Sequence, residues 1–248
     1  SIVMHNWKLI DSNQKISLDN LETLICFNDL VDEAWFFLLS VELEYIGTPI
    51  VRLGIDLVKN NYKIQAQKRA QFLKTLSDSI LAITNCLSRM YENCDPHNFY
   101  TYLRPFLSSF ESIEYRGAKE NPFRSYHGGS AAQSSLIQLI DCILQIDHGS
   151  ERTGQYLKKM RFYMPKEHRL FLETIEKNSP INQWLTEDAS LRPLYNDCIK
   201  RITHFRQVHL EIVAKYIMGQ KQKVGPGHTG TGGTNPMIFL KALKNFLD

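Results

Sequence analysis

The fold is decided by one stretch, residues 190–218, which reads SLRPLYNDCIKRITHFRQVHLEIVAKYIM. Its apolar side chains recur at alternating spacings of three and four residues, which is the repeat of one face of an α-helix. The positions on this face are Tyr195, Cys198, Ile202, Phe205, His209, Ile212 and Tyr216. The pattern predicts a long helix that packs a narrow apolar face against the core.

Proline marks further helix starts on either side of this stretch. Asp95-Pro96, Ser179-Pro180 and Asn235-Pro236 each place a capping residue before a proline, whose missing N–H would have no partner in a first helical turn. Met164-Pro165 opens a fourth helix, over 166–177. The remaining helical segments are expected at 29–58 (interrupted by Gly47 and Pro49), 62–92, 96–110, 131–147, 151–161, 181–187 and 236–247.

Strand signals are scarce. Few stretches alternate apolar and polar residues, and no Asn-Gly or Asp-Gly hairpin turn occurs. The sequence therefore predicts an all-α fold. Residues 113–130 and 219–235 are expected to form two glycine-bearing loops, each long enough to be functional.

Composition excludes several classes of protein. The 248 residues carry 29 Lys and Arg against 26 Asp and Glu, a net charge of +3, which does not indicate a nucleic-acid or anionic-membrane partner. The five cysteines are far apart and never form a C-x-x-C pair, which argues against a disulfide framework and favours a reducing cytoplasm. The most apolar run, 34–41, is much shorter than the roughly 20 residues that cross a bilayer.

Common catalytic motifs are missing from the sequence. The GTGGT run at 230–234 lacks the G-K-[ST] of a nucleotide-binding loop. Neither H-E-x-x-H nor G-x-S-x-G occurs, and no two histidines are four residues apart. A zinc hydrolase is therefore not expected.

His209 lies on the apolar face of 190–218, so its imidazole should point into the core. A buried imidazole needs hydrogen-bond partners or a metal, because an unsatisfied nitrogen costs about 1–3 kcal/mol. Spacing alone favours a core histidine bonded to a backbone carbonyl over a metal ligand. Arg206, one turn earlier, suits either an anionic ligand group or an ion pair.

Asp141 interrupts the apolar segment 131–147, with Ile137 and Leu144 on the same face. A buried carboxylate needs a cation or several donors, so Asp141 serves either a helix-to-helix ion pair or a functional site. Ahead of this segment, Gly128-Gly129-Ser130 provides a capping serine near a helix N-terminus.

The segment 96–110 places aromatic residues around a cation. Its apolar face holds Phe99, Tyr100, Leu103 and either Phe106 or Leu107, with Arg104 one turn after Tyr100. Such an arginine can bind a carboxylate while the rings stack a planar ligand. The alternative is an amphipathic helix whose arginine extends to solvent.

Four blocks of sequence, taken in order, resemble the indoleamine 2,3-dioxygenase family. They are HGGSAAQSS (127–135), RFYMPKEHRLFL (161–172), RQVHLEIVAKYI (206–217) and GTGGTNPMIFLK (230–241). The resemblance extends back through NFYTYLRPFLSSF (98–110) and DEAWFFLLSVE (32–42) to NWKLID (6–11), and so covers essentially the whole chain.

The resemblance implies an all-helical domain that binds haem b through one histidine. Members of this family use dioxygen to open the pyrrole ring of L-tryptophan, giving N-formylkynurenine. The implied partners are L-tryptophan or a related indole, dioxygen, and an electron donor that keeps the haem ferrous. We expect a monomer that binds neither nucleic acid nor a membrane.

The resemblance also implies roles for single residues. His209 matches the iron ligand, and the other cofactor contacts are Arg206, Asp141, Ser130 and Ala131. The substrate contacts are Phe36, Phe99, Tyr100, Arg104, Ser130, Ala131, Thr231 and Gly232. Arg104 matches the arginine that binds the substrate carboxylate, and Ser40, Phe99 and Arg104 are the implied catalytic residues.

Two differences from the family pattern leave other functions open. The family has a smaller helical domain ahead of the point where this chain begins, so 1–248 is expected to be the single large haem domain. Tyr100 stands where better-known members carry Phe. The alternatives are a haem-binding sensor or carrier with little turnover, and a helical interaction domain without haem in which His209 and Asp141 are satisfied core residues.

Overall fold

A computed structural model describes residues 2–149 and 152–220. Its α-helices are α1 (Ile2–His5), α2 (Val31–Ile46), α3 (Thr48–Lys59), α4 (Ala66–Ser88), α5 (Met90–Asn93), α6 (Pro96–Asn98), α7 (Ser135–Leu144), α8 (Arg152–Met160), α9 (Lys166–Asn178), α10 (Ile181–Glu187) and α11 (Arg192–Val213). Two π-helical turns are η2 (Phe99–Leu103) and η7 (Ala214–Met218). The 3₁₀ turns are η1 (Leu18–Asn20), η3 (Arg104–Leu107), η4 (Ala131–Gln133), η5 (Arg161–Tyr163) and η6 (Ala189–Leu191).

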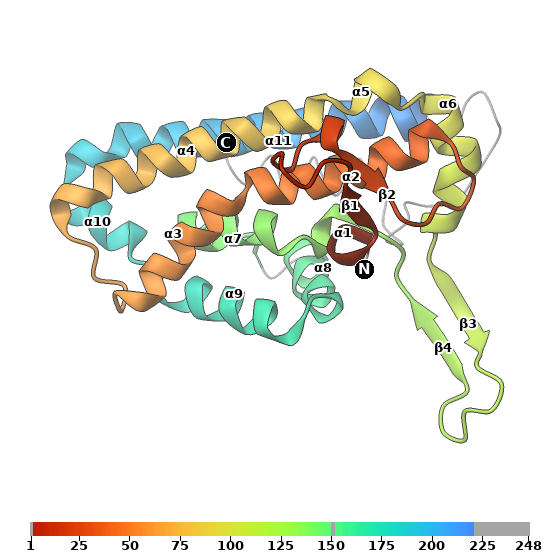
Figure 1. Ribbon diagram of the computed structural model, residues 1–248. Coiled ribbons are helices and arrows are strands. Elements are labelled where there is room, and N and C mark those ends of the chain that lie inside the picture. Colours follow the sequence, from red (N-terminus) through yellow and green to blue (C-terminus); the bar gives the residue numbers. More distant parts are fainter. Residues whose placement is uncertain (1, 150–151, 221–248) are drawn as a thin grey trace.

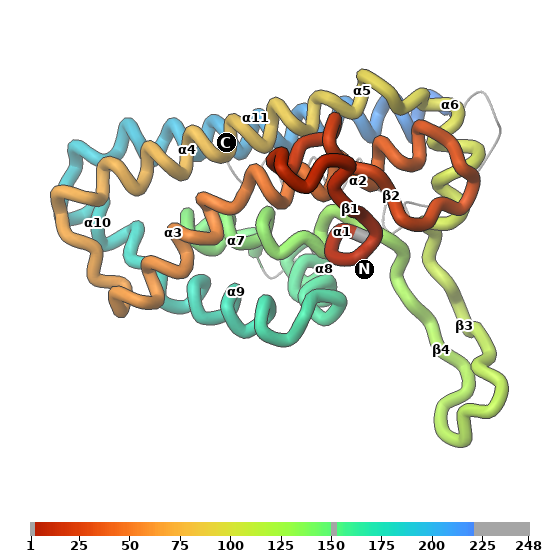
Figure 2. The backbone as a smooth tube through the Cα atoms, viewed as in Figure 1, coloured from red at the N-terminus to blue at the C-terminus, as the bar shows by residue number. Residues whose placement is uncertain are grey.

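The two longest helices, α4 and α11, lie side by side along the molecule (Figure 1). The helices α2 and α3 pack against α4, α7 packs against α3, and α9 packs against α7, an arrangement that the smoothed backbone also shows (Figure 2). The all-α prediction is therefore confirmed, because helices make up most of the described chain.

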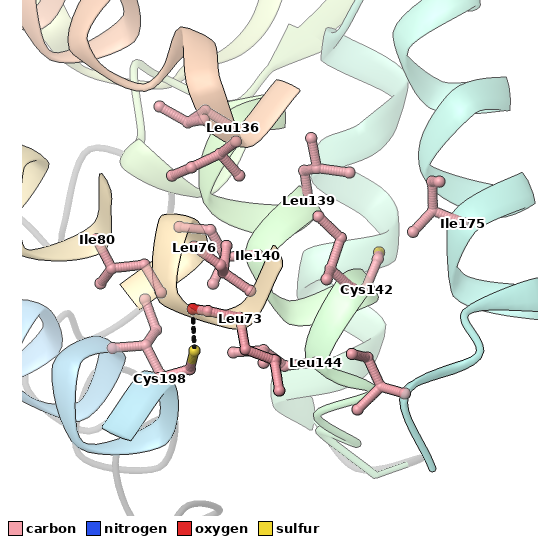
Figure 3. Packing of buried hydrophobic residues seen from close by; sticks show 14 of the residues in the cluster. Leu73, Leu76, Ile80, Leu136, Leu139, Ile140, Cys142, Leu144, Ile175 and Cys198 are labelled. Carbon is pink, nitrogen blue, oxygen red and sulfur yellow. Dashed lines mark hydrogen bonds between the residues drawn. The ribbon is translucent and has the colours of Figure 1, made fainter. Parts of the chain in front are cut away.

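One apolar cluster fills the space between α3, α4, α7, α9 and α11 (Figure 3). Ile80, Ile140 and Cys198 are fully buried there, and the Cys198 thiol donates to the Leu73 carbonyl at 3.3 Å. A second cluster lies at the other end of α4 and α11, where Phe37, Phe99, Val208 and Ile212 meet. The apolar face expected for 190–218 is thus shared between two clusters.

Most helix boundaries agree with the sequence. The structure confirms 181–187 as α10, and it extends α11 through η7 to residue 218. Asp95 caps α6 by accepting from the N–H groups of His97 and Asn98. Ser179 does not cap α10, because its hydroxyl donates to the Ile143 carbonyl of α7 at 2.6 Å.

The segment 96–110 is not one α-helix. It passes from α6 into the π turn η2 and the 3₁₀ turn η3, and ends at Leu107. Pro105 has no N–H, so the α-helical bond to the Thr101 carbonyl cannot form, and the chain adopts turns of other widths instead. Similarly, 131–147 begins with the 3₁₀ turn η4, and α7 starts only after Ser134, whose hydroxyl accepts from the Ile137 N–H.

The expected loop 113–130 contains a β-hairpin, which corrects that prediction. Strands β3 (Phe110–Glu114) and β4 (Phe123–Tyr126) pair antiparallel and extend away from the helices (Figure 1). A second small sheet pairs β1 (Trp7–Leu9) with β2 (Leu21–Thr23). The sequence did not reveal the hairpin because its strands are exposed on both faces, so no apolar alternation marks them, and a long connection replaces a two-residue turn.

The stretch 31–59 is long and apolar enough to cross a membrane by length and composition, which the sequence analysis had not anticipated. Within the structure some of its apolar residues belong to the core, such as the fully buried Ile50 and Leu57, whereas Val31 and Val58 are exposed. At Gly47, between α2 and α3, an added Cβ would clash with the Leu136 side chain of α7. The helices α2 and α3 therefore make core contacts through part of their apolar surface.

Candidate functional site

His209 lies near the end of α11, between the buried residues Arg206 and Ile212. Its ring makes no hydrogen bond to any described residue. The expected hydrogen bond to a backbone carbonyl is therefore not found in the described part of the chain. Burial lowers the pKa of His209 from 6.5 to about 4. The imidazole is therefore neutral at pH 7, with a lone pair available to a metal.

Asp141 and Arg206 form a buried ion pair between α7 and α11. The Arg206 Nη2 lies 2.6 Å from Asp141 Oδ1, and His148 Nε2 lies 2.8 Å from the other carboxylate oxygen. Burial would raise the pKa of Asp141, but the Arg206 charge and the His148 hydrogen bond together hold it below its usual value. Of the two roles expected for Asp141, an ion pair between helices or a functional site, the geometry shows the ion pair.

His148 was missed by the sequence analysis. It follows the end of α7, where Gln145 adopts a left-handed conformation with φ 53° and turns the chain back toward Asp141. A histidine seven residues after a buried aspartate was a weak signal, because α7 had no clear C-terminal mark in the sequence.

Aromatic rings from three elements meet beside α11. The ring centroids of Phe36 in α2 and Phe99 in η2 are 5.2 Å apart, and Phe99 lies edge-on to Tyr216 of η7 at 5.6 Å. The Tyr216 hydroxyl donates to the Cys94 carbonyl at 2.6 Å, which ties η7 to the start of α6. Ser40, one turn after Phe36, donates its hydroxyl proton to the Phe36 carbonyl at 3.1 Å.

These aromatic residues adjoin the His209 segment. Val208 and Ile212, which flank His209, belong to the same apolar cluster as Phe99 and Leu103. The structure therefore brings η2 and α2 to the end of α11 that carries the candidate ligand.

Arg104 is buried at the junction of η2 and η3. Its guanidinium carbon lies 5.1 Å from the centre of the Tyr100 ring, and the residue is 5% exposed. Burial lowers the pKa of Arg104, but an arginine stays protonated in proteins. A buried cation beside an aromatic ring suits an anionic ligand group.

The segment 128–134 is held from two sides. The Gly129 N–H donates to the Leu107 carbonyl at 3.1 Å, which joins the segment to η3. Ser134 donates to Glu44 of α2 at 2.6 Å. Between these contacts, Ser130 accepts from the Ala132 N–H at 3.3 Å, while Ala131 is exposed. Thr231, Gly232 and the segment 236–247 lie outside the described residues.

The described residues fit a haem group. His209 offers a neutral imidazole whose ring makes no hydrogen bond within the described chain, so a nitrogen lone pair is available to iron. Phe36 and Phe99 offer apolar aromatic surface nearby, and Arg104 offers a buried positive charge. Within the described residues, no group of three or more His, Cys, Asp or Glu side chains could hold a bare metal ion instead.

Comparison with known proteins gives the same assignment. The family model described as "Indoleamine 2,3-dioxygenase" matches residues 1–246. The chain is 32% identical to the indoleamine 2,3-dioxygenase of Saccharomyces cerevisiae, over 99% of this chain and 66% of that protein. It is also 32% identical to indoleamine 2,3-dioxygenase 1 of Mus musculus, over 98% of this chain and 65% of the relative.

A third relative is named for a different substrate. The 6-hydroxytryptophan 2,3-dioxygenase of Fusarium equiseti is 32% identical over 92% of this chain and 63% of its own length. The chain thus spans just under two thirds of the length of these relatives. With the family model matched over nearly all of the sequence, the chain belongs to the indoleamine 2,3-dioxygenase family, whose enzymes depend on haem.

Proposed function

We propose that this chain is the haem domain of a dioxygenase that adds both atoms of O₂ across the indole C2–C3 bond of L-tryptophan, giving N-formylkynurenine. The observation that carries this proposal is the neutral His209 imidazole, which has no hydrogen bond within the described chain and whose neighbours Val208 and Ile212 pack in the same cluster as Phe99. The names of the relatives, which act on indoleamines or on 6-hydroxytryptophan, support an indole substrate.

His209 would hold the haem iron, and the bound haem would supply the binding and activation of dioxygen. The neutral state of His209 matters here, because a protonated imidazole has no lone pair to donate. Asp141 fixes Arg206 in place two turns from the end of α11, so this pair would keep the ligand-bearing face of the helix in register.

The substrate would be oriented by side chains of α2, η2 and η3. Phe36 and Phe99 would contact the indole ring, and Arg104 would bind the carboxylate. Ser40 would line the same pocket without acting as a base, since its hydroxyl already donates to the Phe36 carbonyl. Holding the indole in a dry aromatic site is the main contribution of this side of the protein.

Other parts of the assignment concern the chain as a whole. We propose that 1–248 form one helical catalytic domain, that Ser130 and Ala131 contact both haem and substrate, and that Thr231 and Gly232 close over the amino acid. An external electron donor would keep the iron ferrous. A monomer in a reducing cytoplasm is consistent with five free cysteines.

The test is the ferrous–CO absorption spectrum of the chain, purified from haem-supplemented cells, with and without L-tryptophan. We expect a Soret band typical of histidine ligation that shifts when tryptophan is added. His209→Ala should abolish stable haem retention. His204→Ala is the matched control, because His204 is exposed on the same helix and should change nothing. Full haem retention by His209→Ala would disprove the ligand assignment.

Product formation separates the enzyme from a sensor or carrier. With tryptophan, dioxygen and a reductant, the enzyme forms N-formylkynurenine, whereas a sensor or carrier shows the haem spectrum without product. Arg104→Ala should keep the haem and raise the KM for tryptophan, because it removes the cation that binds the carboxylate.

A further inference from the structure

Two neighbouring hydroxyl groups in η2, Tyr100 Oη and Thr101 Oγ1, are buried without a hydrogen-bond partner in the described structure. Tyr100 itself is 7% exposed. Buried hydroxyls in proteins are almost always hydrogen-bonded, and an unpaired one lowers stability. Both hydroxyls therefore keep hydrogen-bonding capacity for a polar ligand group.

The π-helical geometry of η2 explains why the chain itself does not satisfy them. Elsewhere in this protein, helical hydroxyls donate to the carbonyl four residues earlier, as Thr84 does to Ile80 and Thr203 does to Ile199. The wider turn of η2 lacks this arrangement at Thr101. Single π turns are found frequently at functional sites.

Tyr100 is buried but lies outside the three apolar clusters of the described structure. Its neighbours Phe99 and Leu103 belong to the second apolar cluster. Its ring instead lies against the Arg104 guanidinium, 5.1 Å from ring centre to guanidinium carbon. The Tyr100 ring and the Arg104 guanidinium therefore lie side by side at this turn.

We propose that Tyr100 Oη donates a second hydrogen bond to the substrate carboxylate bound by Arg104, and so selects indole amino acids over indole amines. This inference rests on the proposed function and names the substrate class of the same site. A carboxylate can accept about four hydrogen bonds, so it can take donors from both side chains at once. Bonds to a charged acceptor are stronger than those between neutral groups, which gives the tyrosine a measurable share of the discrimination.

The test compares Tyr100→Phe with the wild-type chain carrying haem. Equilibrium dialysis measures the Kd for L-tryptophan, for indole-3-propionate, which keeps the carboxylate but lacks the amine, and for tryptamine, which lacks the carboxylate. Losing one charge-assisted hydrogen bond should raise the Kd of the two carboxylate ligands about tenfold and leave the Kd of tryptamine unchanged. In steady-state assays the KM for tryptophan should rise by the same factor with kcat unchanged.

Tyr102→Phe is the matched control. Tyr102 lies in the same π turn but is 49% exposed, and its ring contacts His97 on the outside of the molecule. The same loss of a hydroxyl there should alter none of the three Kd values. Thermal unfolding of the haem-free chain gives a readout that does not depend on activity: Tyr100→Phe should unfold at an equal or higher temperature, because it removes an unpaired buried hydroxyl.

The outcomes separate this inference from the proposed function. The inference alone is overturned if the Tyr100→Phe chain binds all three ligands as the wild type does. It is also overturned if the affinity for tryptamine falls as much as the affinity for the two carboxylate ligands. An effect confined to ring-hydroxylated tryptophans overturns it too, because the hydroxyl would then contact the ring. A haem-loaded wild-type chain that binds no indole overturns the proposed function, and the inference with it.

Discussion

Asp141 shows how a single charged residue is accommodated inside an apolar helix. The carboxylate is buried between Arg206 of α11, at 2.6 Å, and His148, at 2.8 Å. Both partners favour its charged form more than burial opposes it. Since its pKa is lower in the folded chain than in the unfolded one, Asp141 stabilises the fold above its ordinary pKa, and this contribution is lost as the pH falls through the lowered value.

Asp141→Asn should therefore destabilise the haem-free chain at pH 7. The change removes the negative charge that the Arg206 guanidinium and His148 share inside the fold, which costs about 3 kcal/mol. Urea unfolding measures this loss. Asp78→Asn is the control, because Asp78 is exposed and lies 3.9 Å from Lys74, so its removal should cost less than about 0.5 kcal/mol. Equal losses in the two variants would contradict a buried pair.

His209 should make the stability of the haem-free chain depend on pH. Its folded pKa of about 4 lies below the ordinary 6.5, so between these values the unfolded chain binds a proton that the folded chain excludes. Stability is full above pH 6.5 and falls toward pH 4. The loss is at most about 3 kcal/mol, because the imidazole is partly exposed to water.

The measurement is the free energy of unfolding at several pH values between about 5 and 7, a range that includes the ordinary histidine pKa. His209→Gln should flatten the slope, whereas His204→Gln, on the exposed side of α11, should not. An unchanged slope in His209→Gln would mean that another group causes the dependence.

At the scale of elements, the β-hairpin is the part least connected to the rest. Strands β3 and β4 are exposed along almost their whole length, and the contacts that fix its base are the Gly129 bond to Leu107 and the His127 N–H bond to the Tyr163 hydroxyl at 2.8 Å. Exposed strands bury little apolar surface, so they contribute little to stability.

Replacing residues 114–122 by a short Gly-Ser turn should therefore leave the melting temperature of the chain nearly unchanged, within about 2 °C. Circular dichroism at the helix band measures it. As a contrast, Gly47→Ala places a Cβ against Leu136 and should destabilise by about 1–3 kcal/mol, although it alters a single atom group. A large loss from the hairpin variant would show that the hairpin packs against the helices.

At the scale of the whole molecule, the helical layers protect four of the five cysteines. Cys86, Cys94, Cys142 and Cys198 are buried, and burial raises the pKa of each thiol to about 12. A thiol reacts through its thiolate, so these four should react only after unfolding. Cys26, on the segment between β2 and α2, is partly exposed.

A disulfide-forming aromatic reagent should thus label one thiol in the native chain and five in urea. Cys26→Ser should abolish the native labelling, while Cys86→Ser should leave it intact. Rapid labelling of two or more thiols in the native chain would show that the core opens easily.

The sequence by itself determined most of the helices, the capped start at Asp95 and the buried carboxylate of Asp141. These follow from neighbours three and four residues apart, and such spacing is recorded directly in the chain. The haem assignment came from resemblance instead, since spacing alone favoured a bonded core histidine.

Tertiary structure decided the partners. Arg206 reaches Asp141 across 65 residues, and His148 returns to it only because the chain turns at Gln145. The unpaired Tyr100 hydroxyl depends on a π turn next to Pro105, and the hairpin lacks any apolar pattern. Contacts between distant segments depend on how whole elements pack, and the local spacing of residues along the sequence does not predict that packing.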